Sequence, residues 1–242
     1  MLVAGFPAGA WGTNCYVVAP AAGEQCVVID PGQDAAGGVE DLLREHRLRP
    51  VAVLLTHGHI DHVWSVVPVC GAHDVPAYIH PADRPLLTDP ARGIGLPVGS
   101  AFFRGMTFSE PSEVREIADG GVIELAGLRL TVDLAPGHTP GSVTFRTPVD
   151  PATGTAGAEQ VLFSGDLLFA GSIGRTDLPG GDSAEIMRSL ARVCLPLPDE
   201  TIVLAGHGPR TTIGRERATN PFLRELVEGG PRGTATRPNR GL

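Results

Sequence analysis

The chain has 242 residues, 42% of them hydrophobic, and a formal net charge of −8. This acidic balance argues against nucleic-acid partners, since affinity for a phosphate backbone depends on clustered Lys and Arg. No apolar stretch reaches the length that crosses a bilayer, and the first residues lack the basic and apolar regions of a secretory signal. We therefore expect a globular cytoplasmic protein with no membrane partner.

The cysteines and the length bear on compartment and domain organisation. None of the four cysteines has the short spacing of a zinc-binding pair, and all lie among apolar neighbours, which predicts buried thiols rather than disulfides. They are Cys15, Cys26, Cys70 and Cys194. The length suits one α/β domain, which we place at residues 1–228. Residues 229–242 are rich in Gly, Pro and Arg, which predicts a flexible tail.

The start of the chain predicts a hairpin followed by a helix. Residues 13–19 and 25–29 are apolar runs on either side of the turn-forming segment 20–24. A helix is expected from about Gly38, where apolar residues recur at helical spacing. His46 closes this helix, and an imidazole there interacts favourably with the carboxyl end of the helix, so we interpret it as structural.

The most informative segment is Thr-His-Gly-His-Ile-Asp-His, which directly follows the apolar run 51–55, a predicted buried strand. Three imidazoles and a carboxylate crowded into one loop would stay poorly solvated unless a cation bound their lone pairs. This ligand set suits Zn²⁺, Fe²⁺ or Mn²⁺. One ion is poorly placed to take all four from so short a segment. The spacing favours two adjacent ions, one on His57 and His59 and the other on Asp61 and His62.

Three later residues share the same context, in which an apolar strand ends at a glycine that precedes a ligand type. They are His138, Asp166 and His207. Taken singly, each histidine is as readily structural as ligating, and Asp166 is an ordinary turn residue. Their recurrence beside the histidine motif favours ligands. Asp166 is the best candidate to bridge both ions, because a carboxylate has two oxygens whereas a neutral imidazole has one free lone pair.

Other stretches predict loops. His73 and His80 lie near turn signals and are interpreted as solvated surface histidines. Residues 88–121 show little periodicity and predict a rim of the active site. The large apolar side chains of this rim fit a core anchor and a substrate contact equally well; they are Phe102, Phe103, Met106 and Phe108. Residues 150–159 predict a turn between two strands.

Two helices are expected near the end of the chain. Asp182-x-x-Glu185 has the spacing of a capping box ahead of an apolar helical pattern. Asn220-Pro221 marks the start of a last short helix, and Gly229 marks its end.

The order of the ligand candidates resembles the metallo-β-lactamase superfamily, with a match from about residue 13 to His207. This resemblance implies the α/β class and a four-layer αβ/βα sandwich, with a binuclear site at one edge between the two sheets. The implied ligands are His57, His59 and His138 for the first ion, Asp61, His62 and His207 for the second, and Asp166 as the bridge. Asp30 matches the early aspartate of the family, which braces the histidine loop; a role as a turn carboxylate is compatible with this.

Within the superfamily the chain is most similar to the glyoxalase II-like hydrolases, which cleave hydroxyacyl thioesters of glutathione or a related thiol. The similarity lies in His62 and in residues 163–182 and 206–214. Too few residues follow His207 for the helical domain that binds the glutathione moiety in the better-known form. The thiol is therefore left open.

The expected cofactors are two divalent metal ions, Zn²⁺ foremost, with Fe²⁺ or Mn²⁺ as alternatives. A water shared by two such ions loses its proton near neutral pH and becomes the nucleophile for an acyl carbon. Asp61 and Asp166 are the expected catalytic carboxylates, through the ions and hydroxide that they hold. The expected partner is a small-molecule thioester.

Two further residues are candidate substrate contacts. Arg175 would pair with a substrate carboxylate, although an internal salt bridge with Asp177 fits it somewhat better. Trp64 would form a wall of the pocket, or equally pack into the core.

Alternative functions remain at this point. A persulfide dioxygenase of the same superfamily would hold a single Fe²⁺ on His57, His138 and Asp166. A noncatalytic metal-dependent binding module is a second alternative. A lactonase or β-lactamase would use the same hydrolytic centre on another substrate.

Overall fold

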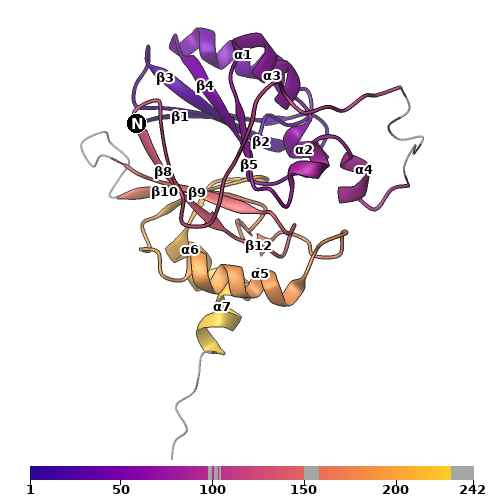
Figure 1. The fold of residues 1–242 in the computed structure, drawn as a ribbon. Coiled ribbons are helices and arrows are strands. Elements are labelled where there is room, and N and C mark those ends of the chain that lie inside the picture. The colour runs from indigo at the N-terminus through magenta and orange to yellow at the C-terminus, as the bar shows by residue number, and fades with distance from the viewer. Residues whose placement is uncertain (98–99, 101–102, 104, 150–157, 230–242) are drawn as a thin grey trace, which may run out of the picture.

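The computed structural model describes residues 1–97, 100, 103, 105–149 and 158–229. In these residues two mixed six-stranded sheets pack face to face, and helices cover the outer face of each (Figure 1). The expected α/β class and four-layer αβ/βα sandwich are confirmed. Within this part of the chain, no helix has both the length and the apolar character required to cross a membrane.

The first sheet is built from the amino-terminal half of the chain, with its strands side by side in chain order. Strands β1 to β3 pair antiparallel, and β4 to β6 continue from β3 in parallel. The strands are β1 (Leu2–Ala8), β2 (Thr13–Ala19), β3 (Gln25–Ile29), β4 (Arg49–Leu54), β5 (Ala77–Ile79) and β6 (Val114–Glu116). The predicted hairpin is therefore β2 and β3, whereas β1 was not predicted.

Two helices cover the outer face of this sheet, at the top of Figure 1: α1 (Ala35–His46) and α3 (Val66–His73). Helix α1 begins three residues before the predicted Gly38. It starts directly after Asp34, which has a left-handed backbone conformation with φ of 55°. It ends at His46, as expected. His73 lies at the end of α3, and its Nε2 is 2.5 Å from Glu40 Oε1, so this histidine is paired rather than simply solvated.

The second sheet has the strand order β14-β13-β10-β9-β8-β7. Strands β7 to β10 pair antiparallel in turn, and β13 pairs parallel with β10. The strands are β7 (Val122–Leu125), β8 (Leu128–Leu134), β9 (Val143–Pro148), β10 (Gln160–Gly165), β13 (Ile202–Ala205) and β14 (Thr211–Thr212). A small hairpin follows β10 and consists of β11 (Leu168–Phe169) and β12 (Ser172–Ile173).

Helices of the carboxyl-terminal half lie on the far side of this sheet, at the bottom of Figure 1. They are α5 (Ser183–Ser189), the π-helical turn η4 (Leu190–Cys194), α6 (Ile213–Thr219) and α7 (Pro221–Glu228). Asp182 caps α5 as predicted, accepting hydrogen bonds from the amides of Ala184 and Glu185. The reciprocal half of the box is not formed: the backbone amide of Asp182 donates to the Gly137 carbonyl at 2.8 Å, and the Glu185 carboxylate pairs with Arg188. Asn220 caps α7, and Gly229 follows its last residue, as expected.

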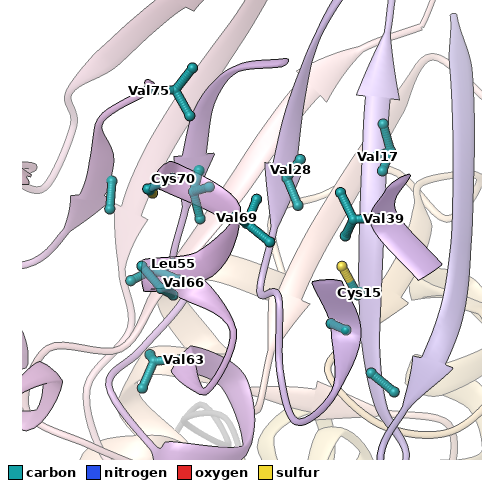
Figure 2. Close-up of a cluster of buried hydrophobic side chains, with 14 of the residues drawn as sticks. Cys15, Val17, Val28, Val39, Leu55, Val63, Val66, Val69, Cys70 and Val75 are labelled. Carbon is teal, nitrogen blue, oxygen red and sulfur yellow. The ribbon is translucent and has the colours of Figure 1, made fainter. Parts of the chain in front are cut away.

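Three apolar layers hold the sandwich together. Because successive strand residues face opposite sides, Val17 and Val28 pack under α1 and α3, whereas Val18 and Val27 face the second sheet. Figure 2 shows side chains of the first of these layers, among them Val39 of α1 close to Val17 and Cys15 of β2. The cysteines are all buried free thiols, as expected from their apolar neighbours.

The long segment between β5 and β7 contains more regular structure than its sequence predicted. It includes the short elements η1 (Arg84–Leu87) and α4 (Pro90–Gly93) as well as β6. Phe103 and Phe108 pack against the first core layer, which favours the anchoring role, and Met106 is 46% exposed. Phe102 and residues 150–157 of the predicted turn lie outside the described residues, as do residues 230–242 of the predicted tail.

Candidate metal centre

The histidine motif lies where β4 ends. His57 and His59 belong to the loop that leaves the strand, and Asp61 and His62 belong to the one-turn helix α2 (Ile60–Val63). The tight course of this loop requires a glycine between the two histidines. A Cβ at Gly58 would lie only 2.8 Å from both the Asp83 carbonyl oxygen and the Leu86 side chain. The loop thus carries His57 and His59, and the short helix that follows it carries Asp61 and His62.

The other three candidates come from the second sheet. His138 lies in the loop after β8, Asp166 directly after β10, and His207 two residues after β13. The two sheets meet here, because the Asn14 amide of β2 donates a 2.7 Å hydrogen bond to the Gly206 carbonyl. All seven predicted ligands are thereby brought to one edge of the sandwich.

The first cluster consists of His57, His59 and His138, each at most 3% exposed. One ring nitrogen from each lies within 4.8 Å of the others. His59 Nδ1 and His138 Nε2 are 2.8 Å apart. Two imidazole nitrogens approach so closely only around a shared proton or a cation.

The second cluster consists of Asp61, His62 and His207. Asp61 Oδ2 is 3.1 Å from His207 Nε2 and 3.5 Å from His62 Nε2. The same carboxylate oxygen accepts a 3.1 Å hydrogen bond from the Thr13 hydroxyl, which orients it toward the cluster. Thr13 was not predicted as a site residue.

Asp166 lies between the two clusters. Its Oδ1 is 3.3 Å from His62 Nε2, and its Oδ2 is 3.5 Å from His138 Nε2 and 3.7 Å from His207 Nε2. One carboxylate oxygen therefore faces the second cluster, and the other reaches both. Asp166 therefore lies where the predicted bridging carboxylate would have to be, and bridging itself stays a prediction.

Several buried polar atoms at this centre lack a hydrogen-bond partner among the described residues. They include Nε2 of His57, Nε2 of His62 and Oδ1 of Asp166. Buried polar atoms without partners are rare because each loses its hydration. Nitrogen and carboxylate donors of this kind are the ligands that Zn²⁺ and Fe²⁺ accept, so the residues present fit a divalent metal pair.

The remaining imidazole nitrogens are held by neighbouring groups. His57 Nδ1 is 3.1 Å from the Thr56 hydroxyl, which itself donates to Asp30 at 2.6 Å. His62 Nδ1 donates to Asp30 Oδ2 at 3.0 Å. Asp30 thus has the bracing position that the sequence predicted. These contacts place the proton on Nδ1 and leave Nε2 free as a ligand.

His138 is held by a backbone carbonyl, which the pattern of side chains in the sequence could not predict. Its Nδ1 donates a 2.7 Å hydrogen bond to the backbone carbonyl of Arg175. The loop passes close because it contains Gly174, where a Cβ would overlap the Asp166 carbonyl and lie 3.1 Å from His138 Nδ1. The glycine-rich run after Asp166 was the only sequence signal of this close approach.

The pKa values of the imidazoles differ between the two clusters. Burial and the surrounding imidazoles lower the pKa of His57, and burial and His138 lower the pKa of His59 to about 4. Burial raises the pKa of Asp61 and Asp166, but nearby imidazoles, chiefly His62, outweigh it and hold both carboxylates ionised. Burial opposes the charged form of His62 and His207, but the neighbouring carboxylates outweigh it and raise the pKa of both imidazoles, so these two must release a proton when a cation binds.

The two candidate substrate contacts, Arg175 and Trp64, have different surroundings. The Arg175 guanidinium forms two hydrogen bonds of 2.7 and 2.8 Å with the Asp177 carboxylate, and both side chains are exposed. Trp64 follows α2 and packs edge-on against Trp11 and Phe108, with ring centroids 5.9 Å apart in each pair. It packs against the first core layer and lines a cavity of about 320 Å³ whose lining includes none of the seven ligand candidates. Substrate contact by either residue stays a prediction.

The metallo-beta-lactamase superfamily model matches residues 8–207 of this chain. The chain belongs to the metallo-β-lactamase superfamily. An uncharacterized protein of Mycobacterium tuberculosis is 48% identical over 227 residues, which cover 93% of this chain and 99% of the relative. Another member, the hydroxyacylglutathione hydrolase GloC of Haemophilus influenzae, is 33% identical over 225 residues, covering 90% of this chain and 95% of GloC.

Two solved structures of the superfamily are also similar. The B3 metallo-beta-lactamase BLEG-1 superposes with a TM-score of 0.76 at 37% identity, covering 92% of this chain and 99% of BLEG-1. TTHA1623, solved in a di-iron-bound form, gives a TM-score of 0.70 at 41% identity, covering 89% and 97%. Members of this family bind divalent metals, and the His-rich cluster of this chain is a candidate site for them.

Proposed function

We propose that this protein is a binuclear metal-dependent hydrolase that cleaves thioesters between a hydroxyacyl group and glutathione or a related small thiol. The observation that carries the proposal is the position of Asp166, whose two oxygens reach two clusters of three donors each. The name of the relative GloC supports the substrate class.

The residues have separate tasks in this reaction. When bound, two divalent cations, which we take to be Zn²⁺ with Fe²⁺ or Mn²⁺ as alternatives, lower the pKa of a water molecule and polarise an acyl carbonyl. His57, His59 and His138 would hold the first, and Asp61, His62 and His207 the second. Asp61 and Asp166 contribute the negative charge that offsets the cations. Asp30 and the Arg175 carbonyl orient the imidazoles.

The chain has no need of its own nucleophile. All four cysteines are buried, and burial raises the pKa of each thiol above its usual range, to about 12 for Cys26, Cys70 and Cys194. Such thiols remain protonated and unreactive at neutral pH. Activated water is the nucleophile that the cluster is suited to supply.

The proposal extends to the setting of the enzyme. The partner is a small-molecule thioester, and neither nucleic acid nor membrane is involved, in keeping with a sequence pI of about 5.4. The site of action is the cytoplasm, where reduced thiols such as those of this chain persist.

A β-lactamase-type hydrolase is the second candidate, because BLEG-1, described as a B3 metallo-beta-lactamase, is 37% identical. It would use the same clusters on a cyclic amide. A substrate panel separates the candidates.

The test uses protein of measured metal content with S-lactoylglutathione, S-lactoyl-coenzyme A, a β-lactam and a lactone. A parallel assay measures oxygen uptake with glutathione persulfide. We expect thioester hydrolysis that depends on metal and exceeds turnover of the β-lactam and the lactone. Preferential β-lactam or lactone turnover would support the second candidate, and stoichiometric oxygen uptake would identify a dioxygenase. Absence of turnover on every substrate would leave only a binding module.

A further inference from the structure

Asp83 is a buried carboxylate that belongs to neither donor cluster. It lies between β5 and η1 with 0% of its surface exposed. Its Oδ2 accepts hydrogen bonds from the Gly58 amide at 2.8 Å and the Thr139 hydroxyl at 2.6 Å. Its Oδ1 accepts a 2.7 Å hydrogen bond from the Gly141 amide. A carboxylate with three donors is well compensated for its burial.

Two of the donors to Asp83 are next in sequence to ligand histidines. Gly58 separates His57 from His59, and Thr139 directly follows His138. One side chain therefore connects the two loops that carry all three histidines of the first cluster. These loops come from different sheets and are far apart in sequence.

The packing around Asp83 leaves these loops little freedom. A Cβ at Gly141 would lie 2.6 Å from Asp83 Oδ1, so only glycine fits against the carboxylate. Ser142 Oγ accepts a hydrogen bond from the Thr139 amide and lies 2.7 Å from the Thr139 hydroxyl. The Thr139 hydroxyl can accept from Ser142 while it donates to Asp83, which fixes its direction.

We propose that Asp83 is a positioning residue of the first metal site, which sets the distance between the His57–His59 pair and His138. Its hydrogen bonds go to two backbone amides and a hydroxyl rather than to the ring nitrogens that would bind metal. Its effect is to hold the loops in the converged arrangement before a cation binds. The inference rests on the proposed metal centre but is independent of the substrate.

A second buried carboxylate, Glu216, also accepts hydrogen bonds from three donors. None of these donors is next in sequence to a ligand histidine, so Glu216 provides a matched control. Glu216 of α6 is 0% exposed. It accepts hydrogen bonds from the Gly171 amide, the Thr211 hydroxyl and the Asn220 side-chain amide at 2.7, 2.5 and 3.0 Å. Removing its charge should cost stability without changing the first cluster.

The experiment compares Asp83→Asn with Glu216→Gln. Each change keeps side-chain size but places an NH₂ group against backbone or hydroxyl donors. Metal-free protein is titrated with Zn²⁺ against a chromophoric chelator and with Co²⁺, whose absorption spectrum reports ligand geometry; thermal melting is recorded in parallel. We expect Asp83→Asn to weaken the first-site affinity by about 10–100-fold and to alter the Co²⁺ spectrum. Glu216→Gln should lower the melting temperature and bind both ions like the wild type.

A wild-type first-site affinity and Co²⁺ spectrum in folded Asp83→Asn would overturn the proposal. If Asp83→Asn does not fold, the test compares Thr139→Val with its control Thr144→Val. Both variants replace a buried hydroxyl by a methyl group of equal size. Thr139 donates to Asp83, whereas the Thr144 hydroxyl has no partner among the described residues. Weaker first-site affinity in Thr139→Val alone supports the role of Asp83, and equal affinities refute it. Because metal affinity is the readout, a failure of the proposed thioesterase activity would be seen separately.

Discussion

His62 Nδ1 lies 3.0 Å from Asp30 Oδ2, and both side chains are buried. The same Asp30 oxygen accepts the Thr56 hydroxyl, and its other oxygen accepts the Thr56 amide at 2.8 Å. Asp30 therefore connects the end of β3 to the start of the histidine loop. With Nδ1 engaged, His62 presents Nε2 to Asp61 and Asp166.

Asp30→Asn should lower the affinity of the second site by about 10–100-fold, because a neutral amide holds the His62 ring less firmly than a carboxylate does. The substitution isolates the charge, since Asp30 has a left-handed backbone with φ of 48° and Asn tolerates this conformation well. Zn²⁺ titration of metal-free protein measures the effect. Unchanged binding of the second ion would show that Asp30 is only a turn residue.

Asp166→Ala should reduce the metal content of purified protein and abolish hydrolysis, because it removes the donor shared by the two clusters. Elemental analysis and kcat on the best thioester measure the two effects. Asp41→Ala is the control, since Asp41 is an exposed carboxylate of α1 that pairs with Arg44. Full activity in Asp166→Ala would contradict the assignment of the bridge.

Gly206→Ala should weaken the second site although it adds a single methyl group. The new Cβ would overlap Asp166 Oδ1 and lie 2.7 Å from His62 Cε1, so both donors would have to move. Gly71→Ala is the matched control, because nothing lies within 4 Å of its Cβ position. Metal affinity and thermal melting of both variants are compared. Equal metal affinities would mean that the site adjusts without loss.

The ligand candidates were predictable because each follows an apolar strand that ends at the same edge of the sandwich. The order of apolar, glycine and ligand-type residues is enough to recognise this pattern. In the structure the candidates lie together. The cap of α7 was equally readable from Asn220-Pro221. Both patterns involve residues that are close in sequence, so they can be recognised without knowledge of the tertiary structure.

Contacts made across the fold left no such pattern. Strand β1 contains Gly5 and Pro7, which obscure its alternation, and its pairing with β2 decides its structure. Thr13 donates to Asp61 across 48 residues of sequence, next to the backbone bridge that it forms with His207. Helix α6 did have a signal in Thr212, whose hydroxyl accepts the Arg215 amide, but its first turn contains a glycine.

Arg175→Ala should leave both metal sites loaded, because the group that holds His138 is the Arg175 backbone carbonyl and not its side chain. If the guanidinium also contacts a substrate carboxylate, KM rises for carboxylate-bearing thioesters while kcat changes little. Asp177→Ala is the control, since it frees the same guanidinium from its exposed ion pair. Loss of metal or a collapsed melting temperature in Arg175→Ala would instead assign the pair a structural role in the loop.

Metal removal should destabilise the whole fold, because the two clusters draw their donors from both sheets. A cation that binds only the folded state stabilises it by about 2.7 kcal/mol per site when its free concentration is about 100 times Kd. Urea denaturation of chelator-treated protein, repeated at increasing Zn²⁺, should therefore show a midpoint that rises with metal concentration. Asp166→Ala should show a smaller rise over the same range. A midpoint independent of metal in the wild-type protein would mean that the seven side chains hold no ion that is linked to folding.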